Sequence, residues 1–323
     1  MLVSIIIPVY NSAEYVERCI RSIANQTWRD IELIIVDDCS KDNSLSLINS
    51  VLAENKWLAE KSTVVQNDVN HGSGFTRRRG QDLAHGDYLI YVDSDDYVSP
   101  DYIRLLAECA LSVDADMVMC GFYCDYGEKL SERHIGEFSG RSDLVCKLLS
   151  GQFHNGLPFK LIRRSLLVDH DIHTSEGLNM FDDLSVSYKI AYFAREISVV
   201  DTPLYYYNRI NTSSQTNLNP GRNISQAVFL IKQIDEFFSD KDTDELIERG
   251  ITFRKIFILG LILLHGTKAE RTENLALFPS FSLKDIYGNS RLPIHYKIAV
   301  MFNQWKLTPL CAVMRLLMNF SKK

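Results

Sequence analysis

The sequence predicts an α/β fold with a mostly parallel central sheet, flanked by helices and followed by a helical C-terminal extension. Three apolar runs of strand length, at residues 2–9, 31–36 and 88–92, each stop abruptly at polar or acidic residues. Segments with helical spacing separate these runs, and this alternation is typical of βαβ units. Parallel strands deliver the polar residues at their carboxyl ends to one cleft, so the pattern also predicts where a functional site lies.

The first two thirds of the chain alternate between apolar runs and segments with apolar residues at three- or four-residue spacing. The runs are expected to form strands at residues 2–9, 31–36, 62–67, 88–92 and 117–123. The spaced segments are expected to form helices at residues 13–27, 45–52, 77–84, 100–112, 141–149 and 181–193. Residues 204–217 are expected to form a strand that breaks into a polar loop.

The best domain boundary is the breaker Asn219-Pro220-Gly221, because proline and glycine together interrupt regular structure. We therefore divide the chain into residues 1–218 and a helical C-terminal region at residues 219–323. Helices in that region are expected at 224–238, 245–264 and 296–320, the last interrupted at Pro309. A chain of 323 residues with 46% hydrophobic content is long enough for one large domain and an extension.

Charge is unevenly distributed along the chain. The net charge of −6 argues against nucleic-acid binding, yet residues 291–323 carry six Lys or Arg and no acid. Apolar residues surround these cations, so we expect peripheral contact with an anionic membrane surface through residues 291–323. A C-terminal helix packed on the domain, with solvated cations, is the alternative. No apolar run reaches ~18 residues, so no spanning helix is expected.

Seven cysteines occur at irregular spacing, without a C-x-x-C pair. An odd number at such spacing does not suit a disulfide framework, so we expect reduced thiols. The first strand follows Met1 without a basic segment and an apolar core before it, so no secretory signal is expected. Both observations predict a cytoplasmic protein.

Acidic residues gather in three clusters, Asp37-Asp38, Asp93-Ser94-Asp95-Asp96 and Asp182-Asp183. Carboxylates bind divalent ions, and such an ion neutralises the charge of a departing nucleoside diphosphate. Alternation in an extended segment puts Asp93 and Asp95 on one side, whereas Asp96 could cap the next turn. The other two clusters have structural alternatives, namely a helix cap for the first and a helix-dipole role for the third.

A segment rich in glycine and arginine, residues 70–80, lies between the first two acidic clusters. Glycine allows close backbone approach to a ligand, and arginine grips phosphate through two parallel hydrogen bonds. Arg77, Arg78 and Arg79 are therefore candidates for a phosphate site. A solvated turn of helix is the alternative for Arg78 and Arg79.

Four motifs and their order in the chain resemble those of the family 2 glycosyltransferases. They are SIIIPVYN, IIVDDCSKDNS, YLIYVDSDDYVSPD and FDDLS. Members of that family use a nucleotide-sugar donor on a GT-A fold, and the resemblance covers about residues 2–215. It implies that Asp38 accepts a hydrogen bond from the imide of a uracil ring. The backbone of Pro8, Val9 and Tyr10 would line the same base pocket, and Arg77 matches an arginine of the family's donor site.

The resemblance also implies roles at the reacting centre. Asp95 would hold Mn²⁺ or Mg²⁺, and Asp93 would contact the ribose or serve as a secondary metal ligand. Asp183 matches the catalytic base, while Asp182, where the family usually has Glu, would contact the acceptor. Lys160 matches a lysine that the family places between the donor and acceptor sites.

The implied activity is inverting, metal-dependent transfer of a sugar from a nucleotide sugar, expected to be a UDP-sugar, to a glycan acceptor. We expect that acceptor to be linked to polyprenyl diphosphate, in bacterial O-antigen, capsule or exopolysaccharide synthesis at the cytoplasmic face of the inner membrane. On this interpretation residues 1–218 bind the donor and catalyse transfer, and residues 219–323 associate with the membrane. Tyr207, Arg209 and residues 213–216 resemble a loop of the family that closes over the diphosphate.

Two other functions stay open. A nucleotidyltransferase also uses carboxylates and Mg²⁺, but it usually carries a glycine-rich loop with Arg or Lys directly after the first strand. This chain has PVYNSAEY there. A catalytically inactive, glycan-binding relative predicts the loss of an acid, and all three acidic clusters are intact.

Overall fold

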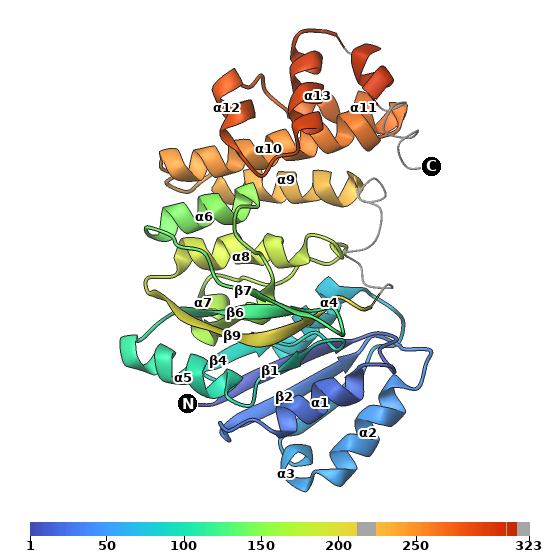
Figure 1. The fold of residues 1–323 in the computed structure, drawn as a ribbon, viewed down its shortest axis with the longest axis vertical. Coiled ribbons are helices and arrows are strands. Elements are labelled where there is room, and N and C mark those ends of the chain that lie inside the picture. Colours follow the sequence, from blue (N-terminus) through green and yellow to red (C-terminus); the bar gives the residue numbers. More distant parts are fainter. Residues whose placement is uncertain (212–223, 308, 315–323) are drawn as a thin grey trace. The chain divides into compact units, whose positions relative to one another are not determined.

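The structure, a computed structural model, describes residues 1–211, 224–307 and 309–314, and the chain divides into two compact units (Figure 1). The first unit comprises Met1–Arg141 and Asn155–Ser214, and the second comprises Ser142–His154 and Gln215–Lys323. The segment Ser142–His154 therefore groups with the C-terminal helices. The predicted boundary after residue 218 and the predicted closing loop at 213–216 lie outside the described residues, so both stay predictions.

The described part of the first unit contains a nine-stranded sheet with the order β3-β2-β1-β4-β8-β6-β9-β5, and β7 pairs with β6. The strands are β1 (Val3–Val9), β2 (Ile31–Asp37), β3 (Ser62–Gln66), β4 (Tyr88–Tyr91), β5 (Tyr97–Val98), β6 (Met117–Asp125), β7 (Leu130–Arg133), β8 (Lys160–Arg163) and β9 (Ile197–Asn208). Strands β3, β2, β1 and β4 run parallel. Their carboxyl ends therefore share one edge, where the first two acidic clusters lie.

Beyond β4 the sheet is mixed. Strand β8 runs antiparallel to β4 and β6, whereas β6 pairs in parallel with β9. The sequence did not predict β8, because Lys160 and Arg163 leave only two apolar residues between them. Strand β9 starts at Ile197 rather than at residue 204, because Asp201 and Pro203 interrupt its apolar pattern.

Helices cover both faces of the parallel strands. The described helices of the first unit are α1 (Val16–Ala24), α2 (Ser44–Glu54), α3 (Lys56–Ala59), α4 (Ser73–Asp82), α5 (Tyr102–Val113), α7 (Arg164–Asp169) and α8 (Asp182–Phe193). Ile5 and Ile7 of β1 join the core cluster that contains Ile20 of α1, while Ile6 faces Gly80 of α4 (Figure 1). Because both faces are covered, the strand is apolar almost throughout.

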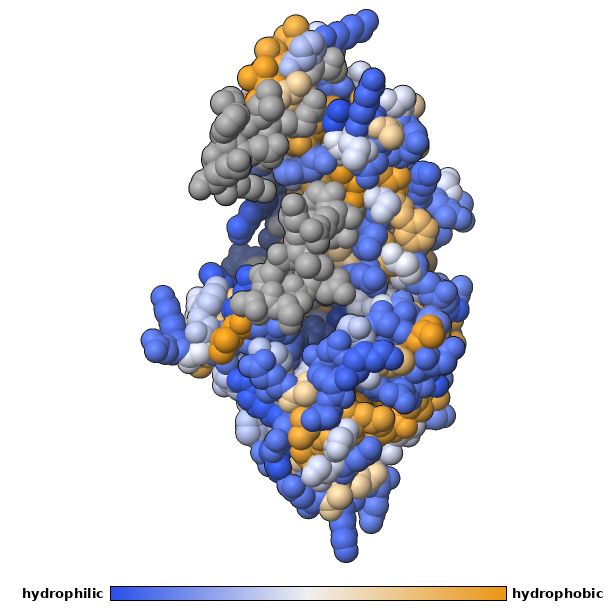
Figure 2. Space-filling model, turned by 90° about the vertical axis from the view of Figure 1, so that its right-hand side faces the viewer, coloured by the Kyte–Doolittle hydropathy of each residue, from blue (hydrophilic) through white to orange (hydrophobic). Residues whose placement is uncertain are grey.

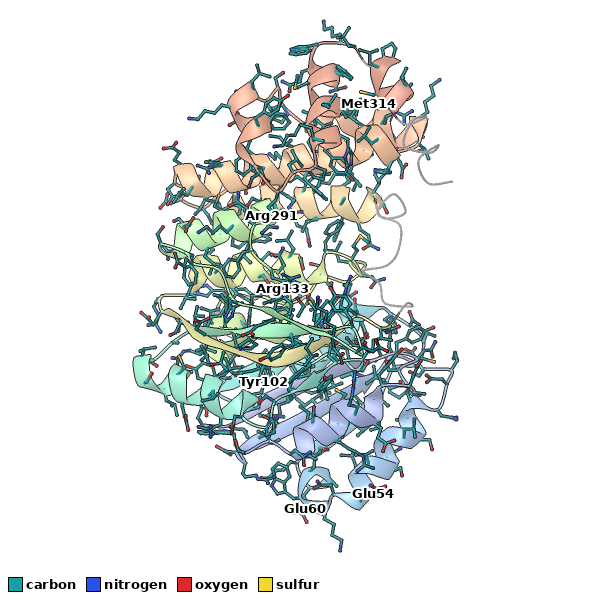
Figure 3. All side chains as sticks on the ribbon, in the orientation of Figure 1. Glu54, Glu60, Tyr102, Arg133, Arg291 and Met314 are labelled. Carbon is teal, nitrogen blue, oxygen red and sulfur yellow. The ribbon has the colours of Figure 1, made fainter. Side chains whose placement is uncertain are left out.

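A further part of the core fixes the end of β9. Tyr102 of α5, labelled in Figure 3, is completely buried, and its hydroxyl donates a hydrogen bond to the carbonyl oxygen of Pro158. The Tyr102 ring lies 6.0 Å from the ring of Tyr205 in β9. Phe159 packs edge-on against Tyr205 at 5.1 Å. These contacts hold β9 where its last residues meet the loop after β4.

The regular secondary structure in the described part of the second unit is helical. The helices are α6 (Arg141–Ser150), α9 (Ile224–Phe238), α10 (Glu245–His265), α11 (Lys268–Asn274), α12 (Leu283–Gly288) and α13 (Ile294–Gln304). The carboxylate of Asp244 caps α10 by accepting from the N–H groups of Leu246 and Ile247, at 3.0 Å each. A Cβ at Gly260 would lie 2.8 Å from the Cβ of Tyr296, so α13 packs directly on α10.

The last predicted helix, over 296–320 with an interruption at Pro309, agrees with the described residues. Helix α13 ends at Gln304, residues 309–314 are helical again, and residues 315–320 lie outside the described part. Among the helices that the structure describes, none is long and apolar enough to cross a membrane.

We expect Gly80→Ala to destabilise the first unit, because the added Cβ would lie 2.3 Å from Cγ2 of Ile6. Overpacking of this kind lowers the free energy of unfolding by about 1–3 kcal/mol, although Gly→Ala normally stabilises a helix. Urea unfolding measures the change. Asp82→Ala on the exposed side of α4 is the control, with an expected change below about 0.5 kcal/mol. A Gly80→Ala protein as stable as the wild type would contradict the close approach of α4 to β1.

Candidate active site

Arg77 of α4 lies at the centre of the candidate site. Its Nη2 donates to Oδ1 of Asp93 at 2.6 Å, and its Nη1 donates to Asp182. Oδ1 of Asp183 lies 3.9 Å from Nη1. The Arg77 side chain is only 8% exposed. Burial alone would lower the pKa of Arg77, but the three carboxylates raise it well above its ordinary value. Residues predicted from three separate motifs are thus in contact.

Asp183, at the start of α8, carries a carboxyl group with an unusual pKa. Burial raises the pKa of Asp183 to about 7; the nearby Arg77 lowers it, and Asp182 and Asp93 raise it further. Its Oδ1 is buried and has no hydrogen-bond partner among the described residues. A carboxylate with a pKa near neutrality suits a general base, since it is ionised at working pH and still binds a proton well.

Lys160, the first residue of β8, is also buried and lies in the electrostatic field of Asp183. Burial lowers the pKa of Lys160 to about 8, and Asp183 opposes that shift. Its Nζ donates to the carbonyl oxygens of Asn155, at 3.0 Å, and Gly156, at 2.5 Å. The Asn155 oxygen also accepts from Oγ of Ser187 in α8, at 2.7 Å. Lys160 therefore ties β8 to the helix that carries Asp183.

The loop Asp93–Asp96 alternates as the sequence predicted. Asp93 and Asp95 are partly exposed, whereas Ser94 and Asp96 are buried. The carboxylate of Asp96 accepts from the Tyr205 hydroxyl at 2.6 Å and from the Asn208 N–H at 2.7 Å. Asp96 therefore fastens the loop to β9. No sequence pattern predicted these partners, because they lie more than a hundred residues away.

The carboxylates of Asp93 and Asp95 are suitable ligands for a divalent cation. Burial raises the pKa of Asp95, and Asp93 raises it further, so a cation would stabilise the ionised form of Asp95. Hard carboxylate oxygens are the ligands that Mg²⁺ and Mn²⁺ take. Oδ2 of Asp95 accepts from Nδ2 of Asn211 at 2.8 Å. Within the described ranges no three His, Cys, Asp or Glu side chains form a metal-binding group, so other ligands would complete the coordination.

Asp38 anchors the segment before α4. Its buried carboxylate accepts from Nδ2 of Asn67 at 2.7 Å and from the N–H groups of His71, at 2.9 Å, and Gly72, at 2.7 Å. The Asp38 N–H donates to the Val9 carbonyl at 2.7 Å, which brings the predicted base-pocket residues together. Of these, Pro8 is partly exposed, Val9 is buried and Tyr10 is 47% exposed. The hydrogen bond between Asp38 and the imide of a uracil ring stays a prediction.

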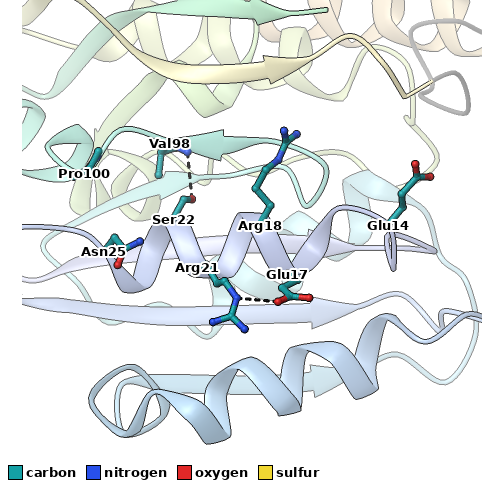
Figure 4. A pocket seen from close by; sticks show the side chains of 8 residues that line it. All are labelled: Glu14, Glu17, Arg18, Arg21, Ser22, Asn25, Val98 and Pro100. Atoms are coloured by element: carbon teal, nitrogen blue, oxygen red, sulfur yellow. Dashed lines mark hydrogen bonds and ion pairs between the residues drawn. The ribbon is translucent and has the colours of Figure 1, made fainter. Parts of the chain in front are cut away.

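A groove of about 520 Å³ runs beside the acidic loop, between α1 and the β5 region (Figure 4). It is lined by Glu14, Glu17, Arg18, Arg21, Ser22, Asn25, Val98 and Pro100. Arg18 links it to the site, because its Nη2 donates to the Asp95 carbonyl at 3.5 Å and its guanidinium lies 4.1 Å from the centre of the Tyr97 ring. None of the predicted site residues lines the groove.

Comparison with known proteins identifies the family. Residues 4–170 match the family described as Glycosyl transferase family 2. The chain belongs to this family. It is 31% identical over 219 residues to the putative glycosyltransferase EpsH of Bacillus subtilis, which covers 66% of this chain and 62% of EpsH. It is 29% identical over 272 residues to the glycosyltransferase GlyG of Streptococcus pneumoniae, covering 79% of this chain and 87% of GlyG.

Solved structures agree on the fold. The S. aureus TarS 1-349 structure in complex with UDP-GlcNAc superimposes with a TM-score of 0.65 at 21% identity, covering 95% of this chain and 92% of that one. The Pyrobaculum calidifontis mannosyltransferase PcManGT, in complex with GDP-Man and Mn²⁺, gives 0.56 at 16% identity, covering 97% and 86%. The predicted GT-A fold, family and enzyme class are thus confirmed, and the family match sets aside the nucleotidyltransferase alternative.

With Asp183 as the general base, nucleotide release is expected to rise with pH through a midpoint near 7, because a carboxyl group accepts a proton only when it is ionised. Lys160→Met removes a cation that favours the ionised form, so the midpoint should move to higher pH. The check is kcat/KM between about pH 5 and about pH 9. Lys129→Met, at an exposed position, serves as control. A folded Lys160→Met protein with an unchanged or lower midpoint would disprove the coupling.

Proposed function

We propose that the protein is an inverting, metal-dependent glycosyltransferase that moves a sugar from a UDP-sugar to a glycan acceptor. The observation that carries this proposal is the cluster around Arg77. It joins Asp93, beside the predicted metal ligand Asp95, to Asp183, whose pKa of about 7 suits a base. A site for the leaving diphosphate and a base for the attacking hydroxyl are thus held by one guanidinium.

In the proposed reaction, Asp183 takes the proton of the acceptor hydroxyl while the oxygen attacks the anomeric carbon. The new bond joins the acceptor oxygen to that carbon, and the bond to the diphosphate oxygen breaks on the opposite face. The nucleoside diphosphate leaves with the electron pair, and the configuration inverts. Asp182 would contact the acceptor, while Ser73 and Arg77 hold its carboxylate in place.

Asp93 and Asp95 would hold the metal ion, Mn²⁺ or Mg²⁺. When bound, such an ion stabilises the negative charge of the departing diphosphate. Mn²⁺ in the mannosyltransferase PcManGT supports a metal in this fold, and UDP-GlcNAc in TarS supports a UDP-sugar as donor. Asp38, Pro8, Val9 and Tyr10 would surround the base.

The proposed setting is bacterial surface-polysaccharide synthesis, with an acceptor linked to polyprenyl diphosphate. Relatives support a polymeric acceptor. S. aureus TarS is a poly(ribitol-phosphate) beta-N-acetylglucosaminyltransferase, 29% identical over 209 residues, and a Bacillus spizizenii poly(ribitol-phosphate) beta-glucosyltransferase is 31% identical over 210 residues. An O-antigen, capsule or exopolysaccharide assembled at the cytoplasmic face of the inner membrane fits this proposal.

The proposed membrane contact is supported by apolar side chains on the C-terminal helices. Figure 2 shows orange apolar surface among blue polar surface at the top of the view. Exposed apolar residues in this region are Leu283, Tyr287, Ile294, Trp305, Leu307, Leu310 and Val313. Lys284, Arg291 and Lys306 are exposed among them. Apolar side chains beside cations suit the interface of an anionic bilayer.

A donor screen tests the reaction. With Mn²⁺ or Mg²⁺, the protein should release UDP from one UDP-sugar but no nucleotide from GDP- or dTDP-sugars. EDTA should abolish release, and Asp95→Ala should lower it by about 100-fold or more, since a transition-state charge loses its partner. Asp169→Ala, at an exposed position on α7, should behave as wild type. Release that persists in EDTA and in Asp95→Ala would refute metal dependence, and silence of a folded protein, even with membrane extract, would favour an inactive relative.

Vesicle sedimentation tests the membrane contact. The protein should sediment with phosphatidylglycerol vesicles and less with neutral ones, and the Trp305→Ser, Leu310→Ser double variant should sediment less. Leu111→Ser is the matched control, because Leu111 is 58% exposed, like Trp305 at 54%, but lies on α5 of the first unit. Wild-type protein that remains in the supernatant with both vesicles would exclude this contact.

A further inference from the structure

Helix α4 takes its N-terminal cap from a distant part of the chain. The first N–H groups of a helix need acceptors, and the capping residue Gly72 has no side chain to supply one. Instead, the Ser73 N–H donates to Oδ1 of Asn179 at 3.1 Å, and the Ser73 hydroxyl donates to Oδ2 of Asp182 at 2.9 Å. The segment that leads into α8 thus closes the start of α4.

The contact between these two segments leaves no room for side chains. A Cβ at Gly72 would lie 2.2 Å from Oδ1 of Asn179, and one at Gly74 would lie 2.4 Å from the Ser175 carbonyl oxygen. The Thr174 hydroxyl donates to the Gly74 carbonyl at 2.6 Å. Residues 174–179 therefore lie directly on the first turn of α4, held at both ends.

The same turn of α4 is held from the donor side. The Gly72 N–H donates to Oδ2 of Asp38, the residue expected to read the base. Further along α4, Arg77 donates hydrogen bonds to Asp93 and Asp182. This part of α4 therefore connects Asp38, on the donor side of the site, with Asp182 and its neighbour Asp183, the proposed general base.

We propose that Asn179 is a positioning residue for sugar transfer. By capping α4, it fixes residues 174–182, and with them Asp182 and Asp183, relative to Asp38 and Arg77. This inference rests on the proposed roles of Asp183 and Arg77. A base must lie within hydrogen-bond reach of the hydroxyl, and a shift of about 1 Å lowers turnover by up to about 100-fold.

Amide hydrogen exchange tests the contact between Asn179 and Ser73 without depending on enzyme activity. In Asn179→Ala, the Ser73 amide and peptides covering residues 72–77 and 180–185 should exchange faster than in the wild type. Asn179→Asp keeps an acceptor oxygen, and a carboxylate is favourable at a helix N-terminus, so protection should return. Glu176→Ala is the control, because its exposed side chain, among the residues that the structure describes, accepts from Arg78 at 3.5 Å and makes no contact with the Ser73 amide. Unchanged exchange in Asn179→Ala would overturn the inference.

Kinetics separate positioning from simple stability. Asn179→Ala should lower kcat about 10- to 100-fold, leave the Kd for UDP within about threefold and recover activity in Asn179→Asp. Equal losses in the Ala and Asp variants, with both folded, would also overturn the inference. A wild type that turns over no donor would refute the proposed function instead, and the exchange result would still decide whether Asn179 ties the segments.

Discussion

The buried guanidinium of Arg77 is the interaction on which the rest of the site depends. Asp93, Asp182 and Asp183 come from two segments far apart in sequence, and three carboxylates so close together would repel one another. A buried charge is stable only when it is paired and hydrogen-bonded. Here the guanidinium supplies positive charge and N–H donors, and the carboxylates supply negative charge and acceptor oxygens. Helix α4, the first turn of α8 and the loop after β4 therefore meet at one cation.

Burial acts in opposite directions on the two titratable groups beside this cation. It raises the pKa of Asp183 to about 7 and lowers that of Lys160 to about 8, since in both cases it disfavours the charged form. The two groups also stabilise each other's charge. Lys160 and Ser187 of α8 both donate to the Asn155 carbonyl oxygen, so the residue that shifts the pKa of Asp183 also helps to hold the helix that carries Asp183.

Apolar periodicity and alternation predicted the features that depend on residues close together in the sequence. The apolar runs predicted the four parallel strands, and alternation separated Asp93 and Asp95 from Asp96. What could not be predicted depends on distant partners. Strand β8 has too few apolar residues to be recognised, and Tyr205 and Asn179 act through hydrogen bonds to residues more than a hundred positions away. No spacing rule reports such a contact.

The glycines at the start of α4 also limit how the enzyme can be redesigned. Gly72 lies against the Asn179 side chain and Gly74 against the carbonyl oxygens of Ser175 and Leu178, and Gly72 has a φ of 90°, which residues with a side chain rarely adopt. An exchange of residues 174–183 for those of a relative, made to change the acceptor, would break this fit unless residues 67–77 were exchanged as well. The two segments would have to be exchanged together, although Ser73 and Asn179 lie 106 positions apart in the chain.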